Sequence, residues 1–391
     1  MKFYPERSIT LKTLFNISVS AASGIEAVTK RELYNLGVTD APAKNGRISF
    51  TGDGELIAKC NLLLRTANRV YVNLAQFKAC DFDELYDGVY AVDWCDYLTA
   101  DAKIIVSAKC VSSRLMAASA CQSICKKAIC EKVYAKIGRY PSEDGARYKI
   151  EISVLKDVVT VSLDTSGEGL HKRGYRGLVG EAPLKETLAS ALIQLSVWNP
   201  SRPFADVFCG SGTFPIEAAL IAKNIPSGLN RDFDFLKWRS LDLSSVFNRV
   251  KEQAISEINP ENDFRISGFD IDENQIRLAN RHAVLAGVDK YVHLQRVDMR
   301  DFSTKHKYGV FISNPPYGER LSDRREVTRL YKDFSIMVSK HPDWSCYTLT
   351  SVADFEKWFG KRADKKRKIF NGKLECYYYS YLGEKPVNKL K

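Results

Sequence analysis

The spacing of apolar residues along the chain predicts a first half that mixes helices and strands. Apolar runs and alternations predict strands at 14–19, 47–50, 66–74, 103–108, 148–155 and 158–163. Apolar residues at helical spacing predict helices from about 25 to 36, 54 to 64, 82 to 89 and 116 to 137. This order of elements predicts two small α+β modules.

In the second half, strands and helices alternate regularly, which is typical of a parallel sheet. Strands are expected at 204–208, 266–270, 292–297 and 309–312, with helices after the first two. The segment 224–265 interrupts this alternation and is expected to hold a loop and a helix. Near the end, Asn371-Gly372 between two apolar stretches predicts an antiparallel hairpin. We therefore expect an α/β fold with a mostly parallel sheet.

A chain of 391 residues is long enough for two or three domains. No apolar run approaches the length of a membrane span, and the first residues lack the apolar core of a signal peptide. We therefore expect a cytoplasmic protein with no membrane partner. The ten cysteines include no Cys-x-x-Cys pair, and no second pair at metal-ligand spacing accompanies Cys121 and Cys125. Reduced thiols and no metal site are expected.

The formal net charge of +11 favours a polyanionic partner. Residues 361–373 hold seven lysines and arginines against one aspartate, so this segment carries more than half of the excess charge. Contact of Lys365, Lys366 and Arg367 with RNA phosphates is the preferred interpretation. A solvated strand edge that blocks pairing with other strands is the alternative.

Two further basic stretches also allow two interpretations. Lys126 and Lys127 lie on the polar side of the predicted helix 116–137, where lysines form a solvated face more often than a phosphate contact. The glycine-rich stretch 166–177 is either a flexible linker or a basic RNA contact that includes an aromatic residue. Its candidate RNA-binding residues are His171, Lys172, Arg173, Tyr175 and Arg176.

The strand at 204–208 ends in a glycine turn, Cys209 to Thr213, immediately before a helix. Glycines let the backbone approach a ligand closely, and the helix N-terminus offers N–H groups to an anion. The turn lacks the third glycine of a dinucleotide fingerprint and the Gly-Lys-[Ser/Thr] of a P-loop, which disfavours NAD and ATP. The next two strands end at Asp270 and at Asp298 with Met299, which are placed to contact the ribose and the adenine of an adenosine-type cofactor.

The fourth strand stops at Asn314-Pro315-Pro316-Tyr317. Because proline cannot donate to a sheet ladder, the chain must leave the sheet here. The amide oxygen of Asn314 and the carbonyl of Pro315 can then accept both hydrogens of a planar exocyclic amine, and the Tyr317 ring offers a face to a base. Taken alone, this motif is equally consistent with an ordinary turn. The three preceding strand ends favour the functional interpretation.

In this order, the motifs resemble those of the class I S-adenosylmethionine-dependent amino-methyltransferases. Within that class, the chain is similar to the THUMP-domain bacterial RNA methyltransferases that modify guanine N2 in large-subunit rRNA. The resemblance covers nearly the whole chain, and its specific elements are the stretches 64–70, 170–176, 181–186, 206–213, 224–231 and 314–321. It implies a ferredoxin-like module (1–65), a THUMP RNA-binding domain (66–165), a basic linker (166–182) and a Rossmann-like methyltransferase domain (183–391), whose mostly parallel sheet has one antiparallel strand.

The resemblance also implies a role for each matching residue. Cys209 to Gly212 would line the methionine part of the cofactor, and Asn314, Pro315, Pro316 and Tyr317 would present the target base. The cofactor would be S-adenosyl-L-methionine, with contacts from Pro183, Lys185, Glu186, Asp206, Cys209, Gly210, Ser211, Gly212, Thr213, Asp270, Ile271, Asp298, Met299 and Asn314.

The Asn-Pro-Pro-Tyr motif does not distinguish guanine N2 from adenine N6. The resemblance favours guanine N2 in rRNA. One alternative is an adenine-N6 methyltransferase acting on RNA or DNA, and another is a non-catalytic RNA-binding or assembly factor. The intact motif at 314–317 argues against the non-catalytic alternative. The sequence does not define an oligomeric state.

Overall fold

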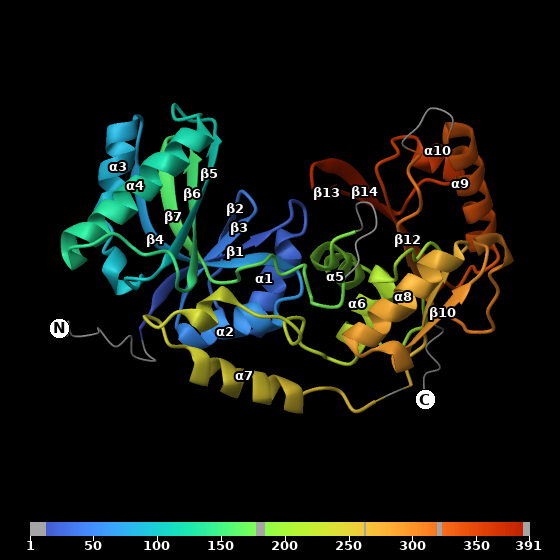
Figure 1. Cartoon of the computed structure of the whole chain (residues 1–391). Helices are drawn as coiled ribbons and strands as arrows, with labels where there is room; N and C mark the ends of the chain where they lie inside the picture. The colour runs from blue at the N-terminus through green and yellow to red at the C-terminus, as the bar shows by residue number, and fades with distance from the viewer. Residues whose placement is uncertain (1–12, 177–183, 262, 319–322, 386–391) are drawn as a thin grey trace. The chain divides into compact units, whose positions relative to one another are not determined.

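The computed structural model describes residues 13–176, 184–261, 263–318 and 323–385, which form two compact units (Figure 1). The first unit contains the described residues within 1–20, 32–170 and 231–253. The second unit contains those within 21–31, 171–230 and 254–391. The strands pair into two seven-stranded sheets, which we call the first and the second sheet.

The first sheet has the strand order β2-β3-β1-β4-β7-β6-β5. Its strands are β1 (Phe15–Ala21), β2 (Ala43–Lys44), β3 (Arg47–Gly52), β4 (Ala67–Lys78), β5 (Lys103–Val111), β6 (Arg147–Leu155) and β7 (Val158–Asp164). The helices along this part of the chain are α1 (Glu26–Asn35), α2 (Gly54–Leu63), α3 (Phe82–Tyr90) and α4 (Ala118–Ile137). Because β4 lies between β1 and β7, one continuous sheet joins the two predicted α+β modules.

Buried apolar and polar side chains alternate along the strands of the first sheet, as expected for a period of two. Ile150 and Ile152 on β6 are fully buried, and between them stands Glu151. The Glu151 carboxylate accepts hydrogen bonds from Lys109 Nζ at 2.9 Å and from the Tyr71 hydroxyl at 3.1 Å, and it pairs with Arg47. Burial alone would raise the pKa of Glu151, but its two cations outweigh that effect and hold the pKa below its usual value. An ionised carboxylate therefore links several strands.

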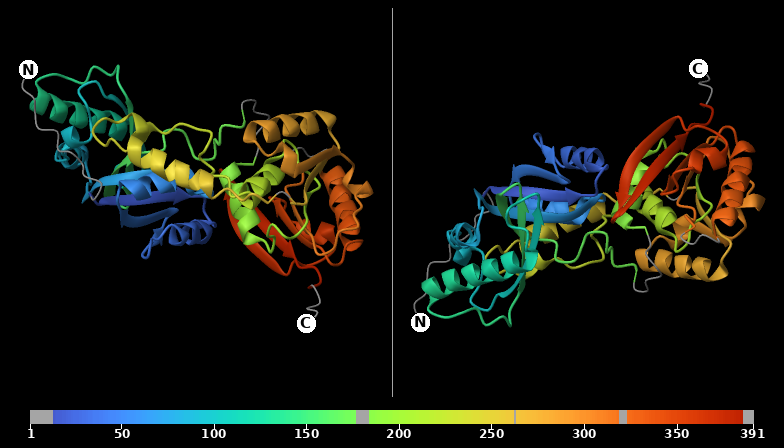
Figure 2. Two further views of the ribbon diagram at one scale, coloured as in Figure 1. Left: turned by 90° about the horizontal axis from the view of Figure 1, so that it is seen from below. Right: turned by 90° about the horizontal axis from the view of Figure 1, so that it is seen from above.

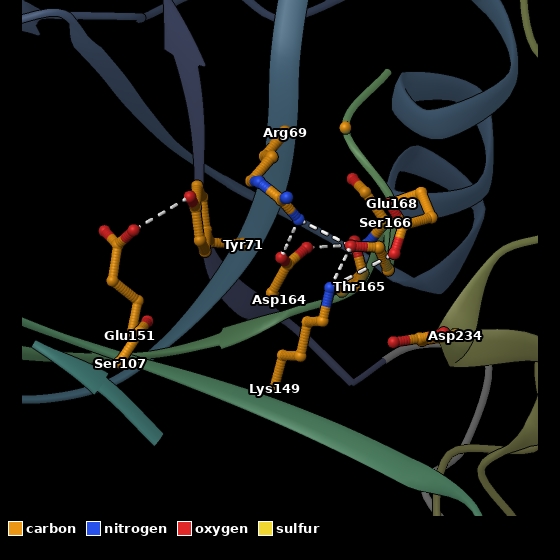
Figure 3. Close-up of polar contacts among 12 residues, drawn as sticks. Arg69, Tyr71, Ser107, Lys149, Glu151, Asp164, Thr165, Ser166, Glu168 and Asp234 are labelled. Carbon is orange, nitrogen blue, oxygen red and sulfur yellow. Dashed lines mark hydrogen bonds and ion pairs between the residues drawn. The ribbon is translucent and has the colours of Figure 1, made fainter. Parts of the chain in front are cut away.

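A second polar cluster lies where β7 ends (Figure 3). Arg69 of β4 pairs with Asp164 and donates to the Gly167 carbonyl at 2.6 Å, which also accepts from Lys149 Nζ at 2.9 Å. Burial raises the pKa of Asp164 to about 6, although Arg69 opposes the rise. These lysine and arginine side chains are engaged in contacts within the first unit.

Part of the segment that interrupts the second half of the sequence packs in the first unit. The Trp238 ring stacks on Tyr148 with centroids 5.0 Å apart, and its Nε1 donates to the Arg147 carbonyl at 2.9 Å. The Arg147 guanidinium makes two hydrogen bonds of 2.9 Å to Asp234. Residues 231–253, which the predicted division assigns to the methyltransferase domain, therefore pack in the first compact unit.

The second sheet has the strand order β10-β9-β8-β11-β12-β14-β13. Its strands are β8 (Phe204–Asp206), β9 (Ile266–Asp270), β10 (Val292–Arg296), β11 (Val310–Ser313), β12 (Ser345–Thr350), β13 (Lys365–Asn371) and β14 (Leu374–Tyr381). The pairings from β10 to β12 are all parallel, and β14 is antiparallel to both β12 and β13. The predicted hairpin at Asn371-Gly372 is thus confirmed; Figure 2 shows it as a long ribbon at one edge of this sheet.

The second sheet is the middle layer of three. The helices of the second half are α5 (Glu186–Leu195), α6 (Thr213–Ala222), α7 (Ser244–Ser256), α8 (Glu273–Ala286), α9 (Asp323–Ser339) and α10 (Phe355–Phe359). Side chains of α5, α6 and α8 share one apolar cluster with Val310 and Ile312, whereas α9 and α10 share another with Phe311. Strand β11 is therefore buried on both faces, which explains its continuous apolar run. The predicted fold class is confirmed.

Candidate active site

The candidate site lies at the carboxyl edge of the second sheet. Strands β8, β9, β10 and β11 run parallel, so their carboxyl ends meet at this edge. The chain order reverses at β8, which pairs with β9 on one side and with β11 on the other. In open α/β sheets, ligands bind outside the strand ends at such a switch point.

The glycine turn after β8 has left-handed backbone angles, which residues other than glycine adopt only with strain. Gly210 and Gly212 have φ values of +50° and +85°. A Cβ on Gly212 would lie 2.9 Å from Ala279 Cβ, whereas one on Gly210 would meet no atom within 4 Å. Gly212 is also the N-cap of α6 and provides no side-chain cap. The turn therefore offers open space at Gly210 and an uncapped helix N-terminus beside it.

Asp270, at the end of β9, holds the glycine turn from the neighbouring strand. Its Oδ2 accepts from Gly210 N at 2.9 Å, and its Oδ1 accepts from Asp272 N at 3.0 Å. A carboxylate has about four acceptor positions, so two remain for ribose hydroxyls. The neighbouring Ile271 side chain is 58% exposed. The nucleoside contacts predicted for Asp270 and Ile271 remain predictions.

Asp298 follows β10 and begins the 3₁₀ turn η4 (Met299–Asp301). Its Oδ1 accepts from Arg300 N and Arg300 Nε at 2.9 Å, and the bond to Arg300 holds the pKa of Asp298 below its usual value. Met299 is 4% exposed and packs in the cluster that contains Phe311. Arg300 also donates to Asp298 Oδ2 at 2.7 Å, so both carboxylate oxygens already accept hydrogen bonds at this strand end.

The Asn-Pro-Pro-Tyr motif leaves the sheet immediately after β11. Asn314 Oδ1 accepts a hydrogen bond from the Tyr317 hydroxyl, which fixes the amide and leaves its second lone pair for another donor. Tyr331 of α9 donates to the Pro316 carbonyl at 2.9 Å. Its hydroxyl also lies 3.0 Å from Thr350 Oγ1. The motif is therefore held by its own tyrosine and by a fully buried tyrosine from α9.

Ser313 and Asp206 connect this motif to the glycine turn. The Ser313 hydroxyl accepts from Val207 N at 3.2 Å, and Asp206 Oδ1 accepts from Phe208 N at 3.0 Å. Burial raises the pKa of Asp206 to about 7, against the opposing effect of the Phe208 and Ser313 hydrogen bonds. The ends of β8 and β11 are thus joined by hydrogen bonds, so the turn and the motif occupy neighbouring positions at one edge.

Comparisons with known proteins identify this arrangement. Residues 173–380 match the family of RMKL-like methyltransferase domains. The chain belongs to this methyltransferase family. Residues 16–71 match the RlmL ferredoxin-like domain and residues 79–164 match the THUMP domain. The predicted resemblance is confirmed at this level.

Related proteins match the methyltransferase over almost its whole length. YpsC of Bacillus subtilis (strain 168), provisionally named an RNA methyltransferase, is 42% identical over 370 residues, covering 94% of this chain and 96% of YpsC. The crystal structure of SMU.472, provisionally named a methyltransferase and complexed with SAH, is 44% identical with a TM-score of 0.90, covering 96% of this chain and 100% of SMU.472. A structure from Listeria monocytogenes (str. 4b F2365) is described as a predicted N6-adenine-specific DNA methylase. It is 44% identical with a TM-score of 0.90, and the match covers 95% of this chain and 97% of the Listeria chain.

The structure corrects the prediction that Arg173, Tyr175 and Arg176 of the methyltransferase contact RNA. Arg173 and Tyr175 are 4% and 2% exposed, and both donate to the fully buried carboxylate of Glu217. The Arg176 side chain is 10% exposed and pairs with Glu186. Arg173 and Tyr175 therefore face the interior of the second unit, and Arg176 contacts the buried acid Glu186.

The other predicted basic contacts lie at the surface. Lys172 and Lys127 are exposed, and Lys126 and His171 are half-buried. Lys126 and Lys127 form ion pairs with Glu143 and Glu131 at 2.6 and 3.8 Å. On β13, the predicted contacts Lys365, Lys366 and Arg367 are all exposed, as is the neighbouring Lys368. All of these predicted RNA contacts remain predictions.

Two predicted cofactor contacts precede α6 in the chain. Lys185 is exposed at the N-cap of α5, and Glu186 is buried at its first position. Burial raises the pKa of Glu186 although Arg176 opposes the rise. Pro183 lies outside the described residues.

Sequence reasoning did not identify several residues that support the site. Glu217 lies in the apolar helix α6, where a lone acid is itself a signal that a buried partner exists. His282 of α8 is 2% exposed, with Nδ1 3.0 Å from the Ser211 carbonyl in the glycine turn. Tyr331 had no distinguishing signal in an amphipathic helix.

The described residues contain neither a membrane-spanning helix nor a cluster of metal ligands. No described helix is both long and apolar enough to cross a membrane. Within the same residues, no cluster of three or more histidine, cysteine or acidic side chains could hold a metal ion.

The buried Asp206 predicts a pH dependence of stability. Because its folded-state pKa of about 7 lies above the unfolded value of 3.8, its contribution is present below about pH 4 and is lost as the pH rises towards 7. We expect the free energy of unfolding of the wild type, relative to Asp206→Asn, to fall by a few kcal/mol over that range. Denaturant titrations of both proteins at several pH values measure the difference. Parallel pH profiles would contradict the assignment.

Proposed function

We propose that this chain transfers a methyl group from S-adenosyl-L-methionine to the exocyclic N2 amine of guanine in large-subunit rRNA. At the coarser level, the chain is an S-adenosyl-L-methionine-dependent methyltransferase that acts on RNA. Membership of the RMKL-like methyltransferase family and the matched THUMP domain support this statement. The proposal goes further than this coarser statement, because it names guanine N2 as the methylated group and large-subunit rRNA as the substrate.

The residues of the glycine turn fit the proposed cofactor. Open space beside Gly210, the uncapped start of α6 and the free acceptor positions of Asp270 suit a ligand with a nucleoside and a charged amino-acid end. Asp270 would hold the ribose, and Asp298 the adenine. When bound, the cofactor supplies an electrophilic methyl group on its sulfonium sulfur.

The observation that carries the amine assignment is the position of Asn314 relative to that turn. Asn314 follows directly on Ser313, whose hydroxyl accepts from Val207 N at the start of the turn after β8. The Asn314 amide oxygen and the Pro315 carbonyl are therefore rigid acceptors close to the proposed cofactor site. Such acceptors suit an –NH₂ group better than a hydroxyl or a ring carbon, because they can take both of its hydrogens.

The chain's contribution to catalysis is positioning. Two hydrogen bonds from the amine to Asn314 and Pro315 would favour a pyramidal nitrogen, whose lone pair then points towards the methyl group. Proline on both sides of the Pro315 carbonyl limits its movement. The Tyr317 ring would stack on the target base, which must leave its helix to reach the site. The amide oxygen is a weak base, so we expect the amine proton to leave to water after transfer.

We further propose that β13 contributes to the RNA contact. Lys365 and Arg367 are exposed on this edge strand, and the formal charge is concentrated in this part of the sequence. Arg367 donates to the Gly24 carbonyl at 3.2 Å, which leaves further donors of its guanidinium for a phosphate.

Removing both charges from β13 should weaken RNA binding in a salt-dependent manner. For Lys365→Ala with Arg367→Ala, we expect the slope of log affinity against log salt to fall by about 1 to 2, since each phosphate contact contributes about 0.7 to 0.9. The control replaces two exposed cations elsewhere in the second unit, Arg277 and Lys290, with alanine. Filter binding between 50 and 200 mM salt measures both slopes. Equal slopes in the two double variants would remove β13 from the interface.

Nucleoside analysis of a labelled product tests the proposed specificity. Purified protein, methyl-labelled S-adenosyl-L-methionine and rRNA from cells that lack this protein are incubated, and the RNA is digested to nucleosides. We expect the label in N2-methylguanosine. Label in N6-methyladenosine would replace the proposal by the adenine-N6 activity that the Listeria protein's description gives for that protein. A properly folded protein that transfers no label to assembled or free rRNA would favour the non-catalytic alternative.

A further inference from the structure

The Arg176 side chain lies between the start of α5 and the start of α6, the helix that follows the glycine turn. One terminal nitrogen donates to the Leu184 carbonyl at 3.1 Å and lies 3.2 Å from Glu186 Oε1, at the start of α5. The other donates to the hydroxyl of Thr213, the first residue of α6. The guanidinium therefore joins α5 to the helix that follows the glycine turn.

One donor of the guanidinium has no acceptor among the residues that the structure describes. The Arg176 side chain is only 10% exposed, and its buried Nε atom has no hydrogen-bond acceptor among the described residues. Buried donors are almost always paired, because an unpaired one loses its hydrogen bond to water without replacement. An unpaired guanidinium N–H next to a proposed ligand site therefore points to an acceptor on the ligand.

The start of α6 independently favours an anion at the same place. Gly212 is the N-cap and makes no side-chain cap, and α6 is ten residues long. The first N–H groups of such a helix carry partial positive charge and commonly bind carboxylates or phosphates. Because Arg176 contacts Thr213 at this helix start, the helix and the guanidinium present positive charge to one region.

We infer that Arg176 binds the α-carboxylate of the cofactor's amino-acid end, together with the first N–H groups of α6. This inference rests on the proposed function because it takes S-adenosyl-L-methionine as the ligand. A guanidinium suits this role because its planar fork matches a carboxylate. The carboxylate of Glu186 lies beside it and provides the opposite charge for the cofactor's α-ammonium group.

Arg173 offers a useful contrast within the same stretch. Its Nε lies 3.4 Å from Glu217 Oε1, and one terminal nitrogen lies 3.4 Å from Glu217 Oε2. The planar edge of the Arg173 guanidinium therefore already faces a carboxylate of the protein. In Arg176, a terminal nitrogen lies 3.2 Å from Glu186 Oε1, and Nε has no acceptor among the described residues. The two arginines, three residues apart, therefore have different roles: Arg173 has a partner in the fold, and Arg176 retains capacity for a ligand.

Two ligands that differ only in the amino-acid end test this inference without RNA and without turnover. S-Adenosylhomocysteine carries the α-carboxylate and the α-ammonium group, whereas 5′-methylthioadenosine carries neither. Calorimetric titration measures both affinities for the wild type, Arg176→Gln, Arg176→Lys and the exposed control Arg277→Ala. For Arg176→Gln, we expect the affinity for S-adenosylhomocysteine to fall about 10- to 100-fold, the range for a charge-assisted hydrogen bond. Its affinity for 5′-methylthioadenosine should stay within about twofold of the wild type.

Arg176→Lys keeps a positive charge beside Glu186, so the ion pair and the fold are retained, but it removes the planar guanidinium group. It should therefore show a smaller selective loss for S-adenosylhomocysteine, and Arg277→Ala should show none. Parallel losses for both ligands in either Arg176 variant would overturn the inference, because they indicate a structural role. Unchanged affinity for both ligands would overturn it as well. Failure of the wild type to bind S-adenosylhomocysteine would instead contradict the proposed function itself.

Discussion

Replacing Asn314 with alanine should reduce the rate of methyl transfer by about 10²- to 10³-fold, the range for losing one positioned hydrogen bond in a transition state. The reason is that the Asn314 amide oxygen would hold the target amine only when the base is in place. The proposed cofactor site is the glycine turn with the ends of β9 and β10, so we expect the affinity for the cofactor to change by less than about twofold. Single-turnover transfer and calorimetric titration of S-adenosylhomocysteine separate the two effects.

Asn280 provides the matched control, because it is an exposed asparagine of α8 in the same unit. Asn280→Ala should leave both transfer and cofactor affinity unchanged. A second variant, Asn314→Asp, keeps an acceptor oxygen at the same position and should retain more activity than alanine if acceptance of the amine hydrogens is the function. Wild-type rates in Asn314→Ala would remove the amide from the mechanism.

Replacing Glu217 with alanine should destabilise the second unit strongly. Glu217 is fully buried and accepts from the Tyr175 hydroxyl at 3.1 Å, from Ser190, and from Arg173 at 3.4 Å. Removing one partner of a buried ion pair costs about 3–5 kcal/mol, because the other charge stays in the interior without its counter-ion. We expect the midpoint of thermal unfolding to fall by about 10 °C.

An exposed ion pair on α8 supplies the comparison. Glu273 is 3.5 Å from Arg277, and the two side chains are 45% and 72% exposed. Glu273→Ala should lower stability by less than about 0.5 kcal/mol, the usual range for an exposed pair on a helix. If differential scanning calorimetry gave the same midpoint for the Glu217 and Glu273 variants, the buried network would not contribute to the stability of the second unit.

The strand ends of the candidate site could be predicted from the sequence because their signals are local. Continuous apolar runs indicate strands buried on both faces, and the glycine turn and Asn314-Pro315 each interrupt a run at a defined residue. Proline at 315 and 316 makes the end of β11 unambiguous, since neither residue can donate to the sheet. Parallel strands then bring these ends to one edge, so local motifs are sufficient to assemble the site.

The environment of the basic stretch could not be predicted in the same way. A run with two arginines and a tyrosine has the composition of an exposed RNA contact, yet Arg173 and Tyr175 are buried. Their burial depends on Glu217, which lies 44 and 42 residues further along the chain. Similarly, residues 231–253 join the first unit through Trp238, whose partner Tyr148 belongs to a distant strand. Long-range pairings of this kind leave no periodic signal in the sequence.

The most direct test of the central proposal is to map methylated guanines in the large-subunit rRNA of cells with and without this protein. Cells that lack it should lose N2-methylation at one guanine. The wild-type chain should restore that methyl group, whereas the stably folded Asn314→Ala chain should not. An unchanged pattern of N2-methylguanine in cells that lack the protein, or the loss of a methylated adenine in its place, would contradict the account.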